Sequence, residues 1–199
     1  MNTLELAQKL ISIKSISPND KGCFKIIKDE ISRLGFKVEV SSYSNVENLL
    51  AKYGSKGKIF CFLGHTDVVP SGPEDQWVVN PFSAQIVDNC LVGRGAADMK
   101  SSIAAFINAV KIFLADNPSP PFQIWILLTS NEEGEISDGK IDKIIADLQN
   151  KNIFIDYCLV GEASSKHSVG DVLRRGRRGS LTGYLTVHGK QGHVAYPKE

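Results

Sequence analysis

IFCFLGHTD, residues 59–67, is an apolar run that ends in a glycine, a histidine and an aspartate. Later apolar runs at 90–93, 122–128 and 157–160 also lead into acidic residues. Strands without polar alternation, spaced by amphipathic helices, are typical of a sheet that is covered on both faces. The sequence therefore predicts an α/β fold with a mixed, mostly parallel sheet and helices on both faces.

Hydrophobic periodicity predicts the other elements and a domain boundary. Asn2 and Glu5 form a capping-box pattern at the start of a first helix. From Ser180 the pattern changes, because apolar and polar residues alternate between Leu181 and His188. This alternation predicts a strand with one solvated face in a different domain, so we expect domains at 1–179 and 180–199. Further helices are expected at 23–34, 99–114 and 141–148, and strands at 37–42, 48–53, 59–63, 84–87, 90–93, 122–128 and 157–160.

The composition is that of a soluble globular protein, with 42% hydrophobic and 23% charged residues. The 23 basic and 22 acidic residues give a net charge of +1, which argues against a nucleic-acid partner. The opening MNTLELAQKL lacks the apolar core of a signal peptide, and no stretch has the length of a membrane span. The four cysteines contain no C-x-x-C pair, which favours reduced thiols. We therefore expect a cytoplasmic protein with no membrane partner.

Acidic residues and a histidine follow the predicted strands: His65, Asp98, Glu133 and Glu162. Ligands of open α/β sheets bind outside the carboxyl ends of the strands, so these side chains should meet. Several carboxylates in one place repel one another unless cations are present, and histidine with carboxylates suits zinc or a similar ion. The set exceeds what one catalytic zinc normally takes, which favours two ions that share a bridging carboxylate.

Each of these residues also has a structural interpretation. His65 taken alone is more often a structural histidine, and Asp98 taken alone reads as a helix N-cap. The adjacent Glu132 and Glu133 point in different directions in an extended loop, so one can bind metal while the other acts as a general base. Asp67 is placed to accept the other imidazole N–H of the histidine, which orients metal-binding histidines.

Five segments resemble motifs of the M20 metallopeptidase family. GHTDVVPSG (64–72), GRGAADMKSSIAA (93–105), TSNEEG (129–134) and YCLVGEASS (157–165) resemble its metal and catalytic motifs. Residues 170–197 resemble the entry into the lid domain in the desuccinylase branch of the family. The resemblance implies a zinc-peptidase-like catalytic domain at 1–179. It also implies that 180–199 begins an α+β lid and dimerisation domain.

The resemblance also implies the metal ligands. His65 and Glu162 would hold one ion, Glu133 would contribute to the other, and Asp98 would bridge them. The family uses two Zn²⁺ or Co²⁺ ions per full-length subunit. The peptide between Asp98 and Met99 would be cis.

Four further roles follow from the same resemblance. Glu132 would be the general acid and base, and Asp67 the partner of His65. Arg177 would bind a carboxylate of the substrate. His193 would stabilise the oxyanion, usually in the active site of a partner subunit of a homodimer.

The implied reaction is hydrolysis of the succinyl amide of N-succinyl-L,L-2,6-diaminopimelate, which yields succinate and L,L-diaminopimelate for lysine and cell-wall precursor synthesis. The Ala-Ala-Asp-Met wording at 96–99 and the region of Arg177 favour this small N-succinyl amino acid substrate. Acetylornithine deacetylases and aminoacylases, which share the metal ligands, are the alternatives within the family.

The sequence departs from the family pattern in three places. Ala163 stands where proline is common, and Arg175 where asparagine is usual. The lid of the family continues beyond Glu199, and a closing segment supplies a last histidine ligand that none of the four histidines here matches. We therefore expect one tight ion, held by His65, Asp98 and Glu162, with a second ion weak or absent. A non-catalytic metal-binding remnant remains an alternative.

Two further segments have their own interpretations. The arginines between 174 and 178 form either a solvated loop or a grip on a carboxylate. Residues 134–140 mimic a phosphate-binding loop, but Ile141 stands where Ser or Thr is needed, and Glu135 and Asp138 would repel phosphate. A nucleotide-binding function is therefore not expected.

Overall fold

The computed structural model describes residues 1–134, 141–176 and 183–196. Contacts divide the chain into two units, Met1–Ala163 and Ser164–Glu199. All helices and strands assigned in the described residues lie in the first unit. The predicted strand at 181–188 is not seen in its described part, because residues 183–188 carry no assigned strand and pair with no other segment. The predicted boundary between 179 and 180 lies outside the described residues.

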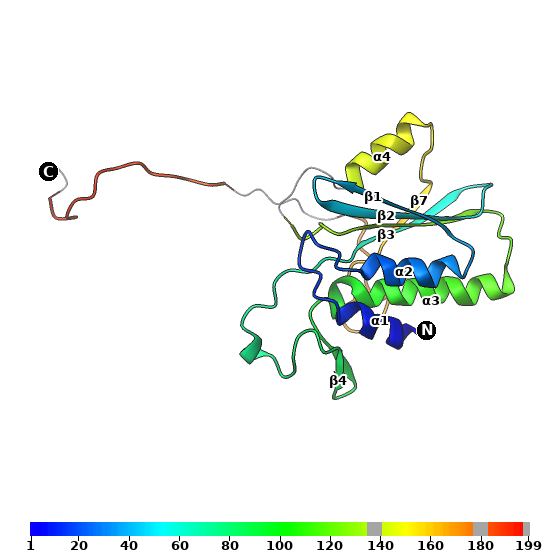
Figure 1. The fold of residues 1–199 in the computed structure, drawn as a ribbon, viewed down its shortest axis with the longest axis horizontal. Helices are drawn as coiled ribbons and strands as arrows, with labels where there is room; N and C mark the ends of the chain where they lie inside the picture. The colour runs from blue at the N-terminus through cyan, green and yellow to red at the C-terminus, as the bar shows by residue number, and fades with distance from the viewer. Residues whose placement is uncertain (135–140, 177–182, 197–199) are drawn as a thin grey trace. The chain divides into compact units, whose positions relative to one another are not determined.

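A five-stranded mixed sheet forms the centre of the first unit (Figure 1). β2 is antiparallel to both of its neighbours, β1 and β6, whereas β3 is parallel to β6 and to β7. In this sheet β2 therefore runs against the other strands, which agrees with the predicted mixed, mostly parallel sheet. The order is β1 (Lys37–Tyr43), β2 (Val46–Tyr53), β6 (Gln123–Thr129), β3 (Ile59–His65) and β7 (Tyr157–Val160).

Helices cover both faces of the sheet, as predicted. α1 (Thr3–Ile11), α2 (Cys23–Ser32) and α3 (Ser101–Asp116) lie on one face, and α4 (Ile141–Asn150) lies on the other (Figure 1). The core divides in the same way, since one hydrophobic cluster joins α1, α2 and α3 to the sheet and a second joins α4. Strand β6 is buried from Ile124 onward because it contributes to both clusters.

Local signals account for where several elements begin and end. The capping box at Asn2 is confirmed, because its side chain accepts from the Glu5 N–H at 2.9 Å and its own N–H donates to Glu5 at 3.0 Å. A small hairpin of β4 (Gln85–Val87) and β5 (Cys90–Val92) turns at Asp88 and Asn89, which both have positive φ. A short 3₁₀ helix, η1 (Glu74–Gln76), precedes the hairpin.

The predicted burial of β7 is wrong. All four of its residues are exposed, with Tyr157 at 54% and Val160 at 50%. The physical reason is that β7 lies at the edge of the sheet and pairs only with β3 among the described strands. An apolar groove of about 510 Å³ lies beside it, lined by residues such as Phe60, Phe106 and Phe113. Residues at the start of β3, β6 and β7 line the groove. It therefore lies at the amino ends of these strands, opposite their carboxyl ends.

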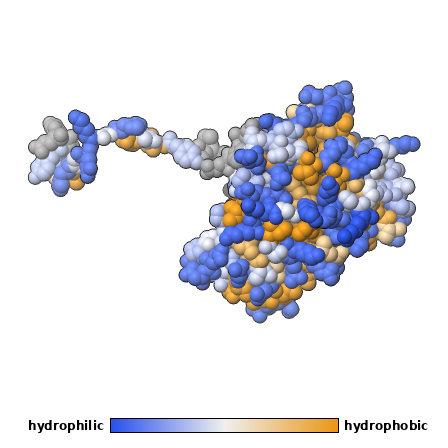
Figure 2. Space-filling model, in the orientation of Figure 1, coloured by the Kyte–Doolittle hydropathy of each residue, from blue (hydrophilic) through white to orange (hydrophobic). Residues whose placement is uncertain are grey.

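The visible surface is mixed in character. Figure 2 shows hydrophobic residues in patches among a majority of hydrophilic ones. No helix in the described ranges is long and apolar enough to cross a membrane.

Candidate metal centre

The carboxyl ends of β3, β6 and β7 meet at one edge of the sheet, because these three neighbouring strands are parallel. His65 is the last residue of β3, and Glu162 follows β7 by two positions. Glu132 and Glu133 follow the end of β6 by three and four positions. The irregular segment η2 (Ala96–Lys100) carries Asp98. The histidine and the glutamates thus lie beyond the strand ends, as predicted. Asp98 does not, because the strand before it, β5, pairs only with β4 in a separate sheet among the described strands, so Asp98 enters the centre from η2.

Three potential ligands converge on one point. The His65 Nε2 atom lies 3.0 Å from Asp98 Oδ1 and 3.3 Å from Glu162 Oε1. One ligand atom from each of these residues lies within 4.8 Å of the others. The His65 side chain is 1% exposed and that of Glu162 18%, whereas that of Asp98 is 55% exposed, so the cluster opens to solvent on the Asp98 side. One imidazole nitrogen and two carboxylate oxygens at this spacing fit a divalent cation.

The imidazole orientation suits a metal ligand. His65 Nδ1 lies 2.9 Å from the backbone carbonyl oxygen of Asp67. A carbonyl oxygen only accepts hydrogen bonds, so Nδ1 carries the hydrogen and, in the neutral ring, Nε2 presents its lone pair to Asp98 and Glu162. The Asp67 carboxylate is farther from the ring, with Oδ1 at 3.5 Å from Nδ1.

The carboxylates around His65 favour the protonated, positively charged form of its imidazole. Burial opposes the charged imidazolium, but the hydrogen bond and charge of Asp67, together with the charge of Asp98, outweigh it and raise the pKa of His65 to about 9. Without a cation the ring therefore carries a second proton, on Nε2, at neutral pH. A metal ion would have to displace that proton.

The Asp67 carboxylate binds the backbone of the loop that carries Glu132 and Glu133, called the glutamate loop below. It is fully buried, and it accepts the Ser17 hydroxyl and the backbone N–H groups of Glu132, at 3.1 Å, and Glu133, at 3.0 Å. Burial acts to raise the pKa of Asp67, but its partners, His65 first, lower it overall. Asp67 therefore connects the histidine at the end of β3 to the loop after β6.

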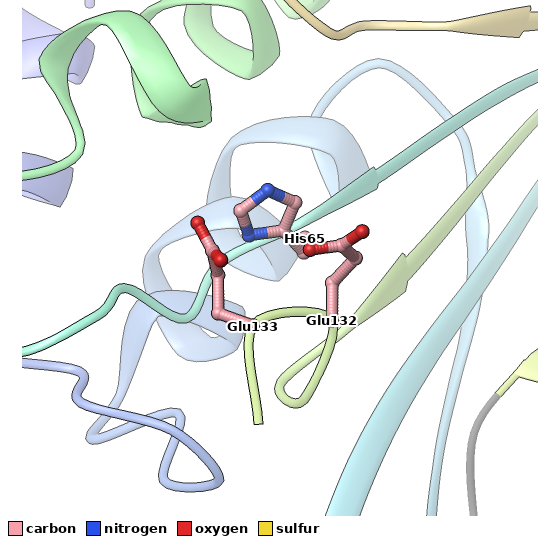
Figure 3. Close-up of side chains that lie close together, drawn as sticks. All are labelled: His65, Glu132 and Glu133. Carbon is pink, nitrogen blue, oxygen red and sulfur yellow. The ribbon is translucent and has the colours of Figure 1, made fainter. Parts of the chain in front are cut away.

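Glu132 and Glu133 lie on either side of His65 (Figure 3). One carboxylate oxygen of each lies within 4.8 Å of the other and of a ring nitrogen. Glu132 is exposed and Glu133 is half-buried. Burial, and next the charge of Asp98, raise the pKa of Glu133. Two groups of potential ligands thus share His65, one with Asp98 and Glu162 and one with the glutamate pair.

The bend at Asp98 follows the expectation from the family resemblance. The Asp98–Met99 peptide is cis, which confirms that prediction. The alternative interpretation of Asp98 as a helix N-cap is wrong, because α3 begins at Ser101 and its N-cap position is Lys100, without a side-chain cap bond. The predicted helix start at Met99 is displaced for the same reason, since Asp98 and Met99 have non-helical φ and ψ.

Residues before α2 form hydrogen bonds with the segment after β3 and with η2, and the sequence analysis did not identify them. Ser15 donates its hydroxyl to the Thr66 carbonyl at 2.7 Å, and the Thr66 hydroxyl donates to Asp20 at 3.0 Å. Lys100, which is fully buried, donates to the carbonyls of α1 residue Leu10 and of Ile13. These partners are about 50 or more positions apart in the chain, so no local pattern indicates them.

The remaining predicted residues lie outside the described residues or in the second unit. Arg177 and most of the predicted phosphate-loop mimic, 135–140, lie outside the described residues. His193 belongs to the second unit, where it is exposed and its Nδ1 accepts the Ala195 N–H at 3.2 Å.

Known proteins resemble this chain in sequence and in structure. The model of peptidase family M20/M25/M40 matches residues 61–190. Succinyl-diaminopimelate desuccinylase of Methylobacillus flagellatus is 49% identical over 98% of this chain and 52% of its own length. The enzyme of the same name from Halorhodospira halophila is 51% identical over 99% of this chain and 52% of its own length. The chain therefore spans about half the length of these curated relatives.

Two solved structures have a similar fold over most of this chain. Human carnosine dipeptidase 1 matches with a TM-score of 0.69 at 25% identity, over 79% of this chain and 37% of that protein. The M20 family metallo-carboxypeptidase Sso-CP2 of Sulfolobus solfataricus matches with a TM-score of 0.68 at 25% identity, over 82% of this chain and 38% of that protein.

Proposed function

The chain belongs to peptidase family M20/M25/M40, and we propose that it is the metal-binding part of a hydrolase that removes succinate from N-succinyl-L,L-2,6-diaminopimelate. The observation that carries the proposal is the convergence of His65, Asp98 and Glu162 at the carboxyl edge of the sheet. The names of the relatives support the substrate. The activity, substrate and partners of the whole protein are part of this proposal.

Membership in the family implies a divalent metal cofactor. The donor set fits one, because a buried imidazole nitrogen and carboxylates converge within 4.8 Å. The ion would be zinc or cobalt. His65 and Glu162 would hold one ion, Glu133 would contribute to a second, and Asp98 would be shared by the two, as the family resemblance implies. Two ions are expected per full-length subunit and one tight ion in this chain. When bound, the metal would polarise the amide carbonyl and acidify the attacking water.

Glu132 is the residue we assign as general acid and base. Its exposed side chain can receive the proton of the attacking water and deliver it to the leaving amine, a role that typically contributes about 10²–10⁴-fold in rate. Asp67 supports this role by holding the backbone N–H of Glu132. It also holds the neighbouring N–H of Glu133, so one carboxylate sets the position of both glutamates relative to His65.

Substrate contacts and assembly rest on the family resemblance. Arg177 would bind a substrate carboxylate, and His193 would stabilise the oxyanion in the active site of a partner subunit. We accordingly propose a homodimer for the full-length protein, a cytoplasmic location and a small-molecule substrate. The extent of the domains, 1–179 and 180–199, belongs to the same proposal.

A combined metal and substrate assay tests the function. The dialysed chain is analysed for bound metal, and the full-length protein is assayed with N-succinyl-L,L-diaminopimelate, N-acetylornithine and other acyl amino acids. We expect one tight ion in this chain and a preference of the full-length protein for the succinyl substrate. A preference for N-acetylornithine would move the assignment to another branch of the family. Metal binding without turnover of any substrate would favour a non-catalytic metal-binding protein.

A further inference from the structure

Met99 lies at the junction of three potential metal ligands. It directly follows Asp98 in the chain, and its side chain is completely buried. The backbone N–H of His65 donates to the Met99 Sδ atom at 3.4 Å. The Met99 side chain thus reaches from the segment that carries Asp98 to the end of β3.

Two glycines make room for this side chain. A Cβ atom added at Gly64 would lie 2.5 Å from the Met99 methyl carbon and 3.0 Å from its Sδ. A Cβ atom added at Gly161 would lie 2.6 Å from the same methyl carbon. Neither glycine has the positive φ that favours glycine for conformational reasons. Space for Met99 is therefore a reason for glycine at both positions.

The two glycines directly precede metal ligands. Gly64 is followed by His65, and Gly161 by Glu162. The thioether therefore touches the backbone next to two of the three ligands, and it is covalently next to the third, Asp98. We propose that Met99 is a positioning residue that sets the spacing of the His65, Asp98 and Glu162 ligands.

Other buried side chains surround the end of the Met99 side chain. A methionine is normally adaptable and its methyl end can shift at little cost. Here the walls of the site are also occupied, since a Cβ at Gly161 would meet the Phe62 ring and one at Gly64 would lie 3.4 Å from Leu128. Met99, Phe62 and Leu128 are all buried. The position of the methyl group is therefore tied to the ends of β3 and β7.

The size of the expected loss of metal affinity follows from how closely ligand distances are held. Metal–ligand distances in proteins hold to about ±0.2 Å, so small shifts of the two strand ends weaken ligation. Residues that orient metal ligands without touching the ion typically contribute about 10–100-fold in affinity. Truncation of Met99 should therefore weaken metal binding by about that factor, beyond any loss of stability.

The inference rests on the proposed metal site, and Co²⁺ binding tests it. Metal-free wild type, Met99→Leu, Met99→Ala and the control Ile27→Ala are titrated with Co²⁺, and affinity and visible absorption are recorded after thermal melts establish folding. Ile27 is a fully buried residue of α2, so its truncation also leaves a core cavity. We expect Met99→Ala to bind about 10–100-fold more weakly with an altered spectrum. Ile27→Ala should stay near wild type. Met99→Leu, which keeps the volume but removes the sulfur acceptor of the His65 N–H, should weaken binding less than Met99→Ala does.

A second pair of variants keeps the test valid if Met99→Ala folds poorly. Gly64→Ala should weaken Co²⁺ binding because its Cβ presses on Met99, and the same change should cost much less when Met99 is also Ala. Equal affinity and spectra for wild type and a folded Met99→Ala, or an effect of Gly64→Ala that is the same in both backgrounds, would overturn the inference alone. Absence of Co²⁺ binding by wild type would instead refute the metal site, and the inference with it.

Discussion

Replacement of Asp67 by Asn tests the structural logic of the centre most directly. The wild-type carboxylate accepts three hydrogen bonds with two oxygens: Oδ1 accepts the Glu132 N–H, and Oδ2 accepts the Glu133 N–H and the Ser17 hydroxyl. The amide of Asn has one oxygen, and its nitrogen only donates. One backbone N–H of the glutamate loop must therefore lose its acceptor and face another donor.

The expected cost follows from that loss. An unsatisfied buried donor costs about 1–3 kcal/mol, and loss of the charge weakens the bonds that remain. Ser17→Ala is the matched control, because it removes one donor to the same oxygen and leaves the carboxylate and both N–H bonds in place. Asp67→Asn should therefore lower the free energy of unfolding of the metal-free chain more than Ser17→Ala does.

The pH dependence adds a second check. Because the pKa of Asp67 is lowered in the folded chain, its contribution to stability is present above the ordinary pKa of 3.8 and is lost as the pH falls through the lowered value. Urea unfolding of both variants and the wild type, at pH 7 and at several pH values below 4, measures this difference. A deficit for Asp67→Asn that is no larger than that of Ser17→Ala at pH 7, or that does not shrink in acid, would refute the reasoning.

Other predictions concern the ligands and the loop. Because the pKa of His65 is raised to about 9, its protonation stabilises the metal-free chain below pH 6.5, and that stability is lost as the pH rises through 9. Between pH 6.5 and 9 the apparent Co²⁺ affinity should rise about tenfold per pH unit, because the ion displaces the imidazole proton. An affinity that does not change with pH in this range, measured by titration, would contradict this. In the full-length protein Glu132→Gln should lower turnover about 10²–10⁴-fold and keep the metal, whereas Glu133→Gln should lose an ion; elemental analysis showing the reverse would exchange their roles. Gly134→Ala should lower the melting temperature, because its Cβ would run into a side-chain oxygen of the same loop and lie 3.1 Å from Ser17, while Gly176→Ala, in open space, should not.

The sequence alone was sufficient for features with a local cause. The apolar run of β6 (Gln123–Thr129) predicts a strand covered on both faces, and it is buried from Ile124 onward. The capping residues Asn2 and Glu5 mark the start of α1 because their bonds span only three positions. The polar residues that directly follow strands were predicted to converge because parallel strands place their carboxyl ends together. His65 and Glu162 do meet in this way, whereas Asp98 reaches them from η2, which follows the separate two-stranded sheet of β4 and β5.

Only the tertiary structure decided which residues support those ligands. Ser17 lies 50 positions from Asp67, whose carboxylate accepts its hydroxyl hydrogen bond. Met99 lies 34 positions from His65, whose backbone N–H donates a hydrogen bond to its sulfur. The exposure of β7 (Tyr157–Val160) likewise depends on its place at the sheet edge, since its four residues read as a buried strand. Periodicity and spacing report on neighbours in the chain. Contacts between distant segments depend instead on strand order and packing, which determine where each side chain finds its partner.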